Sequence, residues 1–291
     1  MNDSTPALPP QRLLLATDLC ARCDRPLERA KQLAREWQTG LAVLTVRDGP
    51  QTPDEVASWL DGDQRVPAFE LAARRELAEE FAGSGVAPTL QVAEGDVADG
   101  IRATAAAMQD ALVVMGASRN DSFQELILGS TAERLSQDLP QPLLVVRRRT
   151  RGSYQRILVA NDFSEAARRA LETAAAFFPG RRITLFHALE GSAGAAGEVA
   201  ADAVQDALAR SELFLDACTL PGGARARIAP VIGHGRVTEA VTRHVQDQAI
   251  ELAVLGVHRH SGMARVFMGT RSSDLLQHLA CDTLLVRAAD G

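Results

Sequence analysis

The chain carries an internal duplication, and this feature limits its possible folds more than any other. The segment Arg12-Leu-Leu-Leu-Ala-Thr-Asp18 returns as Arg156-Ile-Leu-Val-Ala-Asn-Asp162. The segment from Ala111 to Arg147 matches the one from Glu251 to Arg287 without a gap, at an offset of 140 residues. A period of this length is that of a domain rather than of a solenoid repeat, so we expect two domains of similar fold.

Within each copy, short apolar runs rich in Leu, Val and Ile alternate with segments that favour helix. The expected strands are residues 13–16, 41–46, 89–92, 112–115 and 143–146 in the first copy, and 157–160, 183–188, 226–231, 252–255 and 283–286 in the second. The expected helices are residues 26–37, 67–82, 97–107 and 131–138, and then 165–178, 198–220, 237–248 and 272–278. Strands that are apolar on both faces and alternate with helices indicate a parallel sheet covered on both sides. The sequence therefore predicts an α/β fold with two doubly wound domains, each built on a five-stranded parallel sheet.

The repeat also sets the expected boundaries. We expect a disordered N-terminus over residues 1–10, a first domain over 11–147, a linker over 148–152 and a second domain over 153–288. A basic run at this junction, interpreted as solvated linker surface, consists of Arg147, Arg148, Arg149 and Arg151.

The closing strand of each domain is short and apolar, and at a sheet edge it would leave backbone groups unpaired. We therefore hypothesise that the two closing strands pair with each other, which makes the chain an internal pseudo-dimer with an approximate two-fold axis. A higher homo-oligomer is compatible with this arrangement.

Composition excludes several classes of function. With 46% hydrophobic and 23% charged residues, the chain has the composition of an ordinary globular protein. Its formal net charge of −6 argues against general binding to nucleic acid, which depends on the neutralisation of phosphates. No apolar run is long enough to cross a membrane, and the N-terminal residues lack the pattern of a signal peptide. We expect a cytoplasmic protein with neither a nucleic-acid nor a membrane partner.

A glycine-containing loop follows the fourth expected strand of each copy. It reads Gly116-Ala-Ser-Arg119, nine residues and Gly129-Ser130 in the first copy, and Gly256-Val-His-Arg259, nine residues and Gly269-Thr270 in the second. Glycine lets a backbone approach an anion closely, and the helix start that follows favours negative charge. In doubly wound sheets, ligands bind at the carboxyl ends of the strands, where these loops lie. Neither a Walker A loop nor a G-x-G-x-x-G fingerprint is present.

These features make each half similar to a universal stress protein domain. The points of resemblance are the opening strand that ends in Asp, the Gly95-Asp96 and Gly235-Arg236 turns, the glycine loop and the closing Pro142-Leu-Leu-Val-Val146. The resemblance covers about residues 11–288. It implies an adenine nucleotide alpha hydrolase-like fold and a non-enzymatic stress-response module that binds ATP or AMP.

The resemblance also implies site residues, since ATP-binding members hold the adenosine at the ends of the first two strands and the phosphates in the glycine loop. In the first half these are Ala16, Thr17, Asp18, Val46, Gly116, Arg119, Gly129 and Ser130. In the second half they are Ala160, Asn161, Asp162, Ala188, Gly256, Arg259, Gly269 and Thr270.

Arg119 and Arg259 depart from the family pattern, because they stand where the family's motif has its second glycine. An arginine there either strains the loop, if the position needs a positive φ, or contacts the phosphate with its own charge. Two alternatives to nucleotide binding therefore stay open: a partner-binding or scaffold protein with degenerate clefts, and a slow ATPase. Asp121 places a carboxylate in the first loop, so we expect any nucleotide to bind more tightly in the second half.

The remaining polar clusters favour no metal site. Cys20 and Cys23 form a C-x-x-C at an expected helix start, where either redox chemistry or simple helix capping would fit; Ser164 stands at the corresponding place in the second half. The histidines of the second half lack the fixed spacing of zinc ligands; they are His187, His234, His258 and His260. We expect no metal ligands and no catalytic residues.

Overall fold

The computed structural model describes residues 9–19, 24–47, 68–108, 110–117, 129–190, 201–257 and 270–288. In the first half the elements are β1 (Arg12–Ala16), α1 (Asp24–Trp37), β2 (Gly40–Arg47), α3 (Ala68–Glu80), β3 (Thr89–Glu94), α4 (Val97–Ala107), β4 (Ala111–Gly116), α5 (Ser130–Asp138) and β5 (Leu143–Val146). In the second half they are β6 (Arg156–Ala160), α6 (Glu165–Phe177), β7 (Arg182–Leu189), α7 (Ala201–Asp216), a short 3-10 helix (Arg225–Arg227), β8 (Ile228–His234), α8 (Val237–Asp247), β9 (Leu252–Val257), α9 (Thr270–His278) and β10 (Asp282–Arg287).

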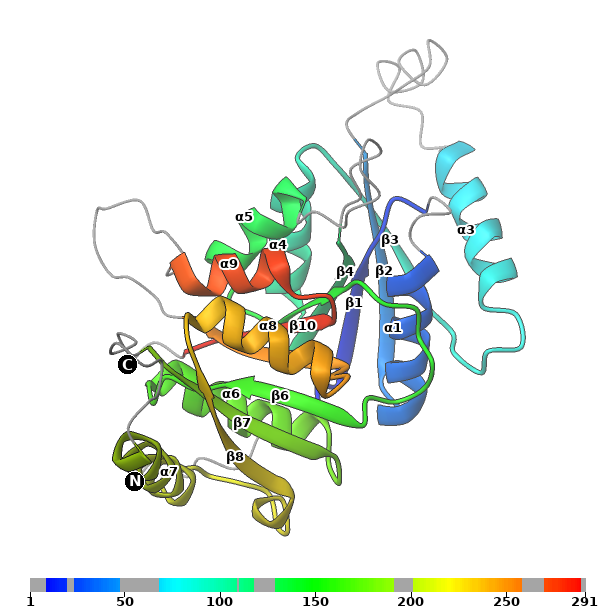
Figure 1. Cartoon of the computed structure of the whole chain (residues 1–291). Coiled ribbons are helices and arrows are strands. Elements are labelled where there is room, and N and C mark those ends of the chain that lie inside the picture. The colour runs from blue at the N-terminus through cyan, green and yellow to red at the C-terminus, as the bar shows by residue number, and fades with distance from the viewer. Residues whose placement is uncertain are drawn as a thin grey trace, which may run out of the picture.

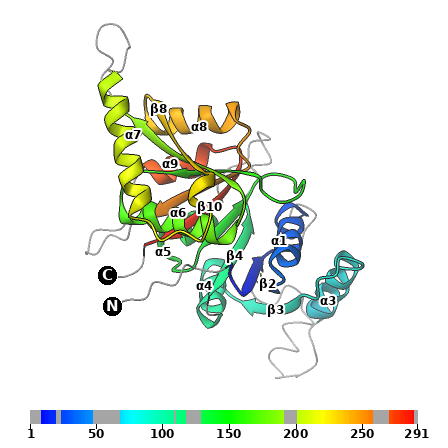
Figure 2. The ribbon, with the colours of Figure 1, turned by 90° about the horizontal axis from the view of Figure 1, so that it is seen from below.

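The strands form one ten-stranded sheet in the order β3-β2-β1-β4-β5-β10-β9-β6-β7-β8. Within each half all neighbouring strands are parallel, which confirms the predicted doubly wound α/β fold. Alternate residues of a buried strand face opposite sides of the sheet, so Leu13 and Leu15 pack with α1 while Leu14 packs with α4. The helices α1, α3, α6 and α7 lie over one face of the sheet, and α4, α5, α8 and α9 lie over the other (Figures 1 and 2). Their apolar side chains form a separate core on each face.

The two halves join through an antiparallel pair between β5 and β10, as hypothesised from the sequence. We call this junction of the two strands the seam. Leu144 lies opposite Leu284, and the flanking pairs are Val145 with Thr283 and Leu143 with Leu285. Since Leu284 is the repeat counterpart of Leu144, this register places the pseudo-two-fold axis between these two leucines. The pairing fuses the two expected five-stranded sheets into one and removes two exposed strand edges.

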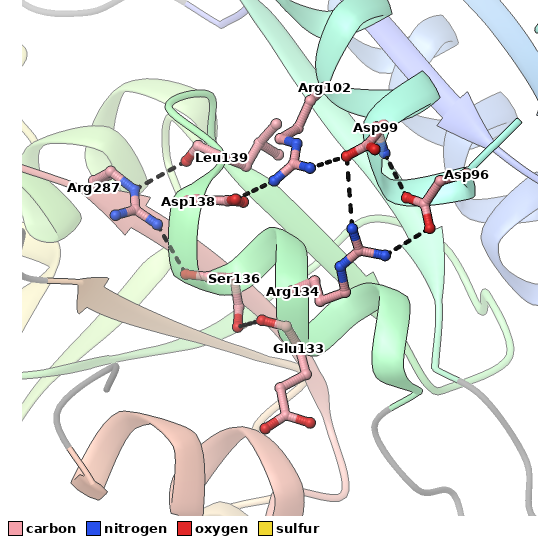
Figure 3. A network of polar contacts seen from close by, with 9 residues as sticks. All are labelled: Asp96, Asp99, Arg102, Glu133, Arg134, Ser136, Asp138, Leu139 and Arg287. Carbon is pink, nitrogen blue, oxygen red and sulfur yellow. Dashed lines mark hydrogen bonds and ion pairs between the residues drawn. The ribbon is translucent and has the colours of Figure 1, made fainter. Parts of the chain in front are cut away.

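Each half has one arginine that donates hydrogen bonds to the last helix of the other half. Arg287, which follows the seam in the second half, donates to the carbonyls of Ser136 and Leu139 at the end of α5, at 2.9 and 3.0 Å (Figure 3). Its repeat counterpart Arg147 donates to the carbonyl of Leu276 in α9. A guanidinium suits the C-terminal end of a helix, where carbonyl groups lack intrahelical partners.

The interpretation of the whole basic run as solvated linker is therefore wrong for Arg147, which is buried. Its exposed fraction is only 2%, whereas Arg148, Arg149 and Arg151 are exposed as expected. Burial lowers the pKa of the Arg147 guanidinium.

The expected disordered N-terminus also needs a correction at its end, because Pro10 is buried and its carbonyl accepts a hydrogen bond from Thr39 at 2.9 Å.

A buried carboxylate completes the seam. Asp282 is fully buried and accepts from the backbone N–H groups of Arg147 and Arg148, at 2.8 and 2.9 Å, and from the Tyr154 hydroxyl at 2.6 Å. Arg29 of α1 lies 3.5 Å from the same carboxylate and 3.9 Å from the centre of the Tyr154 ring. Burial beside this carboxylate raises the pKa of Tyr154 well above its ordinary value. One acidic group of the second half thus binds three groups from the first half and the linker.

Candidate functional site

The turn after the first strand has the same local geometry in both halves. The Thr17 hydroxyl accepts from the Leu19 N–H at 3.0 Å, and the Asn161 side-chain oxygen accepts from the Phe163 N–H at 2.9 Å. These side chains replace a backbone turn bond, and the residue two positions later takes a left-handed conformation, with φ of 57° at Leu19 and 63° at Phe163. Such conformations are unfavourable for residues with a side chain and concentrate at functional sites.

A pocket opens in the second half at the carboxyl ends of β6, β7 and β9, on the face covered by α8 and α9. The space within it, including the solvent at its open mouth, is about 640 Å³. Its lining is Ala160, Asn161, Asp162, Ala167, Phe186, His187, Ala188, Val237, Val241, Leu255, Gly256 and Leu275. β6 and β9 are neighbours, and the strand order runs in opposite directions from them, to β7 and β8 on one side and to β10 on the other. The pocket therefore lies at the topological switch point of this half.

Asn161 is the polar group of this pocket that most needs a ligand. Its exposed fraction is 5%, and its Nδ2 is buried without a hydrogen-bond partner among the described residues. A buried amide N–H that lacks an acceptor is costly, so native proteins rarely leave one unpaired. The side-chain oxygen is already fixed by the Phe163 N–H, which leaves Nδ2 as the available donor.

The other polar groups of the pocket have partners within the protein. The Asp162 carboxylate accepts from the Ser164 N–H at 3.0 Å, and the Ser164 hydroxyl caps α6 by accepting from the Ala167 N–H at 3.1 Å. His187 Nδ1 lies 2.8 Å from the Asn161 carbonyl oxygen. Because a carbonyl oxygen only accepts, Nδ1 carries the proton of this bond. These bonds hold the turn that forms one wall of the pocket.

The glycine that begins each loop has a packing role. A Cβ on Gly256 would overlap the Ala166 carbonyl group and lie 2.8 Å from the Ala167 nitrogen, in the backbone at the start of α6. Among the described residues, a Cβ on Gly116 would meet the Pro26 ring, at 3.3 Å from Cγ. Gly256 is therefore required for the close approach of α6 to β9.

The corresponding edge of the first half is tied by an ion-pair network between α4 and α5 (Figure 3). Asp96 caps α4 by accepting from the Asp99 N–H at 3.0 Å, and it binds Arg134 of α5 at 2.7 Å. Arg102 of α4 binds both Asp99 and Asp138. The hydrogen bond from Arg134 lowers the pKa of Asp96, so this carboxylate is charged at neutral pH.

Two charges of this network are reversed in the second half. Arg236 stands at the position of Asp96, caps α8 without a side-chain hydrogen bond and is 87% exposed, with Glu239 at 3.9 Å. Asp274 of α9 stands at the position of Arg134. The first turn of α5 carries Glu133, whereas the first turn of α9 carries no acidic residue. The described edge of the second half is thus the more favourable of the two for an anion.

Five of the site residues expected in the second half lie together around the pocket: Ala160, Asn161, Asp162, Ala188 and Gly256. In the first half the counterparts stand at the carboxyl ends of β1, β2 and β4; they are Ala16, Thr17, Asp18, Val46 and Gly116. Gly129 is the N-cap of α5, Ser130 begins that helix, and Thr270 begins α9. Several residues of the sequence interpretation lie outside the described part of the chain: Arg119, Asp121, Arg259, Gly269, His258, His260, Cys20 and Cys23.

The apolar residues of the pocket were not expected from the loop motifs. Val237, Val241 and Leu275 come from the sheet-facing sides of α8 and α9, and Phe186 comes from β7. Their periodic spacing marks them as buried, which is the signal that the sequence offers. Whether a buried position lines the core or a cavity depends on the packing of two helices against the sheet, which periodicity does not specify.

The two described cysteines, Cys218 and Cys281, pack in the cores on the two faces of the sheet, and their reactivity tests how well these cores are shielded. Burial raises the pKa of both the Cys218 and the Cys281 thiol to about 12. Only about one thiol in ten thousand is then ionised at pH 8, and the thiolate is the reactive form. We expect iodoacetamide to modify Cys218 and Cys281 at least a hundredfold more slowly in the native protein than in urea, as measured by peptide mass spectrometry. Rapid native labelling of either residue would contradict this.

Within the described part of the chain, no three His, Cys, Asp or Glu side chains are grouped in a way that would hold a metal ion. The described helices include none that is long and apolar enough to cross a membrane.

Comparison with known proteins agrees with the fold. The sequence model of the Universal stress protein family matches residues 10–147 and again residues 153–287. A universal stress protein of Synechocystis sp. is 22% identical over 178 residues, which are 61% of this chain and 58% of that relative; the chain thus spans little more than half of its length.

Two solved structures extend over almost the whole chain. A universal stress protein from Archaeoglobus fulgidus DSM 4304 superposes with a TM-score of 0.68 at 17% identity, covering 96% of this chain and 99% of its own. A Pseudomonas aeruginosa UCBPP-PA14 protein assigned to the same group gives a TM-score of 0.66 at 17% identity, with 96% and 93% covered. At these identities the likeness concerns the fold. Because the family model matches nearly the whole chain in two successive segments, the chain belongs to the universal stress protein family and carries two of its domains in tandem.

Proposed function

We propose that the second half binds an adenine nucleotide, ATP or AMP, in the pocket around Asn161, and that the chain is a non-enzymatic module of the cytoplasmic stress response. The observation that carries the proposal is the buried Asn161 amide, which has no acceptor among the described residues and lines a pocket at the switch point of the sheet. A ligand with an acceptor atom at that place would pair with this donor.

The pocket walls support a flat, largely apolar group such as a purine base. Side chains from β7, β9, α8 and α9 supply apolar surface on several sides. The Asn161 Nδ2 group then donates to a ring nitrogen of the base, which gives orientation as well as affinity. This division between apolar walls and a few placed polar groups is usual in small-molecule sites.

The charge at the pocket edge supports phosphate binding in the second half. Arg236 precedes Val237, which lines the pocket, and its exposed guanidinium is available to a phosphate at short range. The first turn of α9, which begins at Thr270 and holds no acidic residue, adds backbone N–H groups. In the first half, Asp96 and Glu133 occupy the corresponding places and repel an anion.

A non-enzymatic role is supported by the chemistry of the described lining. Its titratable side chains are Asp162 and His187, and both hold the turn after β6 through hydrogen bonds. We propose that these two side chains shape the turn rather than transfer protons to a ligand. We propose neither a nucleic-acid nor a membrane partner.

The test is isothermal titration calorimetry of the full-length protein with AMP and with ATP. We expect one nucleotide for each chain. Asn161→Asp removes the donor while it keeps the oxygen that accepts from Phe163, so we expect it to weaken binding more than tenfold; the loss of a hydrogen bond and the added negative charge both contribute. Thr17→Asp places the same charge at the corresponding turn of the first half and should leave the affinity unchanged.

Equal losses in the two variants would contradict the assignment to the second half. If neither nucleotide binds the wild type at millimolar concentration, nucleotide binding is wrong and a scaffold role with degenerate clefts takes its place. Release of phosphate from ATP by the purified wild type, lost in Asn161→Asp, would contradict the non-enzymatic role.

A further inference from the structure

We propose that Phe163 is a positioning residue, which fixes the Asn161 amide through a stack of side chains that extends from α7 to β7. This inference rests on the proposed nucleotide site, since it assigns the groups that orient its recognition donor. The stack consists of Arg210 of α7, Phe163 in the turn after β6 and His187 of β7.

The backbone conformation at Phe163 is unfavourable, so other contacts must stabilise it. Its φ of 63° is in the left-handed region, which is unfavourable for a residue with a large side chain. The ring has two close neighbours: the Arg210 guanidinium lies 4.3 Å from its centre, and the His187 ring centre lies 4.5 Å away. Phe214 of α7 adds an edge contact at 5.9 Å. The stack therefore holds the turn in a conformation that the chain would otherwise resist.

Two members of the stack are bonded directly to Asn161. The Phe163 N–H donates to the Asn161 side-chain oxygen at 2.9 Å, and His187 Nδ1 donates to the Asn161 carbonyl oxygen at 2.8 Å. Both oxygens of Asn161 are thus fixed by groups whose rings contact each other. The consequence is that the orientation of Nδ2, the buried donor, is set by the position of the Phe163 ring.

The first half shows that the turn itself does not need an aromatic residue. Leu19 takes nearly the same φ, 57°, and its N–H is held by Thr17 in the same way. Thr45 stands where the second half has His187. An aliphatic residue therefore satisfies the local backbone, so the ring at Phe163 and its two stacking partners serve the asparagine.

The chain allows this to be measured without a ligand. It contains three asparagines, Asn2, Asn120 and Asn161, so selective 15N labelling of asparagine gives three pairs of side-chain amide signals. In the free wild type we expect the Asn161 side-chain amide to have a heteronuclear NOE as high as that of the rigid backbone. Phe163→Leu, which copies Leu19, should lower this NOE to that of a mobile side chain, and Phe163→Tyr should preserve it.

The same variants are then titrated with AMP as full-length proteins. We expect Phe163→Leu to bind about tenfold more weakly at nearly unchanged melting temperature, and Phe163→Tyr to bind within twofold of wild type. Leu19→Ala is the matched control in the first half and should change neither the Asn161 signal nor the affinity. Rescue by tyrosine separates positioning by the ring from a general packing effect.

The outcomes distinguish this proposal from the proposed function. An ordered Asn161 amide in Phe163→Leu overturns the positioning role, whether or not AMP binds. A mobile amide together with unchanged AMP affinity overturns its link to the ligand. If wild type fails to bind AMP while the amide depends on Phe163 as expected, the nucleotide assignment fails and the positioning role stands.

Discussion

Replacing Asp282 by alanine is expected to lower the free energy of unfolding by about 3–5 kcal/mol, because the substitution removes the only carboxylate among the described residues that contacts Arg29, Tyr154 and the Arg147 N–H together. The Arg29 guanidinium would keep its hydrogen bonds to Gln32 and Gly152 but lose its buried counter-charge, and the Tyr154 hydroxyl would lose its acceptor. In a protein of this size such a change lowers the melting temperature by roughly 10 °C. Thermal unfolding followed by circular dichroism measures it.

Asp274→Ala provides the matched control, since this aspartate is exposed on α9 of the same half. We expect its melting temperature to stay within about 2 °C of wild type. Asp282→Asn keeps an acceptor for the two backbone N–H groups and should fall between the two. If Asp282→Ala melts like Asp274→Ala, the buried carboxylate does not hold the halves together.

Gly256→Ala is expected to destabilise the protein by about 3 kcal/mol and to abolish binding in the second-half pocket. A methyl group at this position overlaps the backbone at Ala166 and Ala167, which cannot rotate away as a side chain can. The start of α6 would have to move, and with it the turn that carries Asn161 and Asp162. Chemical denaturation and titration with AMP measure the two effects.

Gly116→Ala is the equivalent change in the first half and serves as its control. Among the described residues the added methyl group meets the Pro26 ring at 3.3 Å, so we expect a change in stability below about 1 kcal/mol and unaltered AMP binding. Similar losses in both variants would show that the glycines serve a common purpose, such as close approach of a ligand, rather than the specific packing of α6.

The sequence was sufficient for the fold because the repeat and the apolar periodicity act at every strand. The helix expected over residues 67–82 is α3 (Ala68–Glu80), and the strand expected over 226–231 is β8 (Ile228–His234). The pairing of β5 with β10 also followed from the sequence, since a short apolar strand at the end of a parallel sheet requires a neighbour.

The details of the site and the seam required the structure. Arg147 looks like any residue of a basic run, and only the crossing of the chain at the seam places it against α9. Asp282 follows a cysteine and precedes an apolar strand, and nothing in its neighbourhood in the sequence indicates that α1 supplies its cation. Contacts of this kind join residues more than a hundred positions apart, so local patterns do not reveal them.

The seam also explains why the two halves are no longer interchangeable. Asp282 corresponds to Pro142 in the repeat, and the buried residues of α6 include no cation comparable to Arg29 of α1. Two copies of the second half, joined through β10, would bury a pair of carboxylates without a guanidinium. Two copies of the first half would bury a pair of guanidiniums without a carboxylate. Pairing of two like halves is therefore disfavoured by uncompensated buried charge, and pairing of the two unlike halves within one chain is favoured.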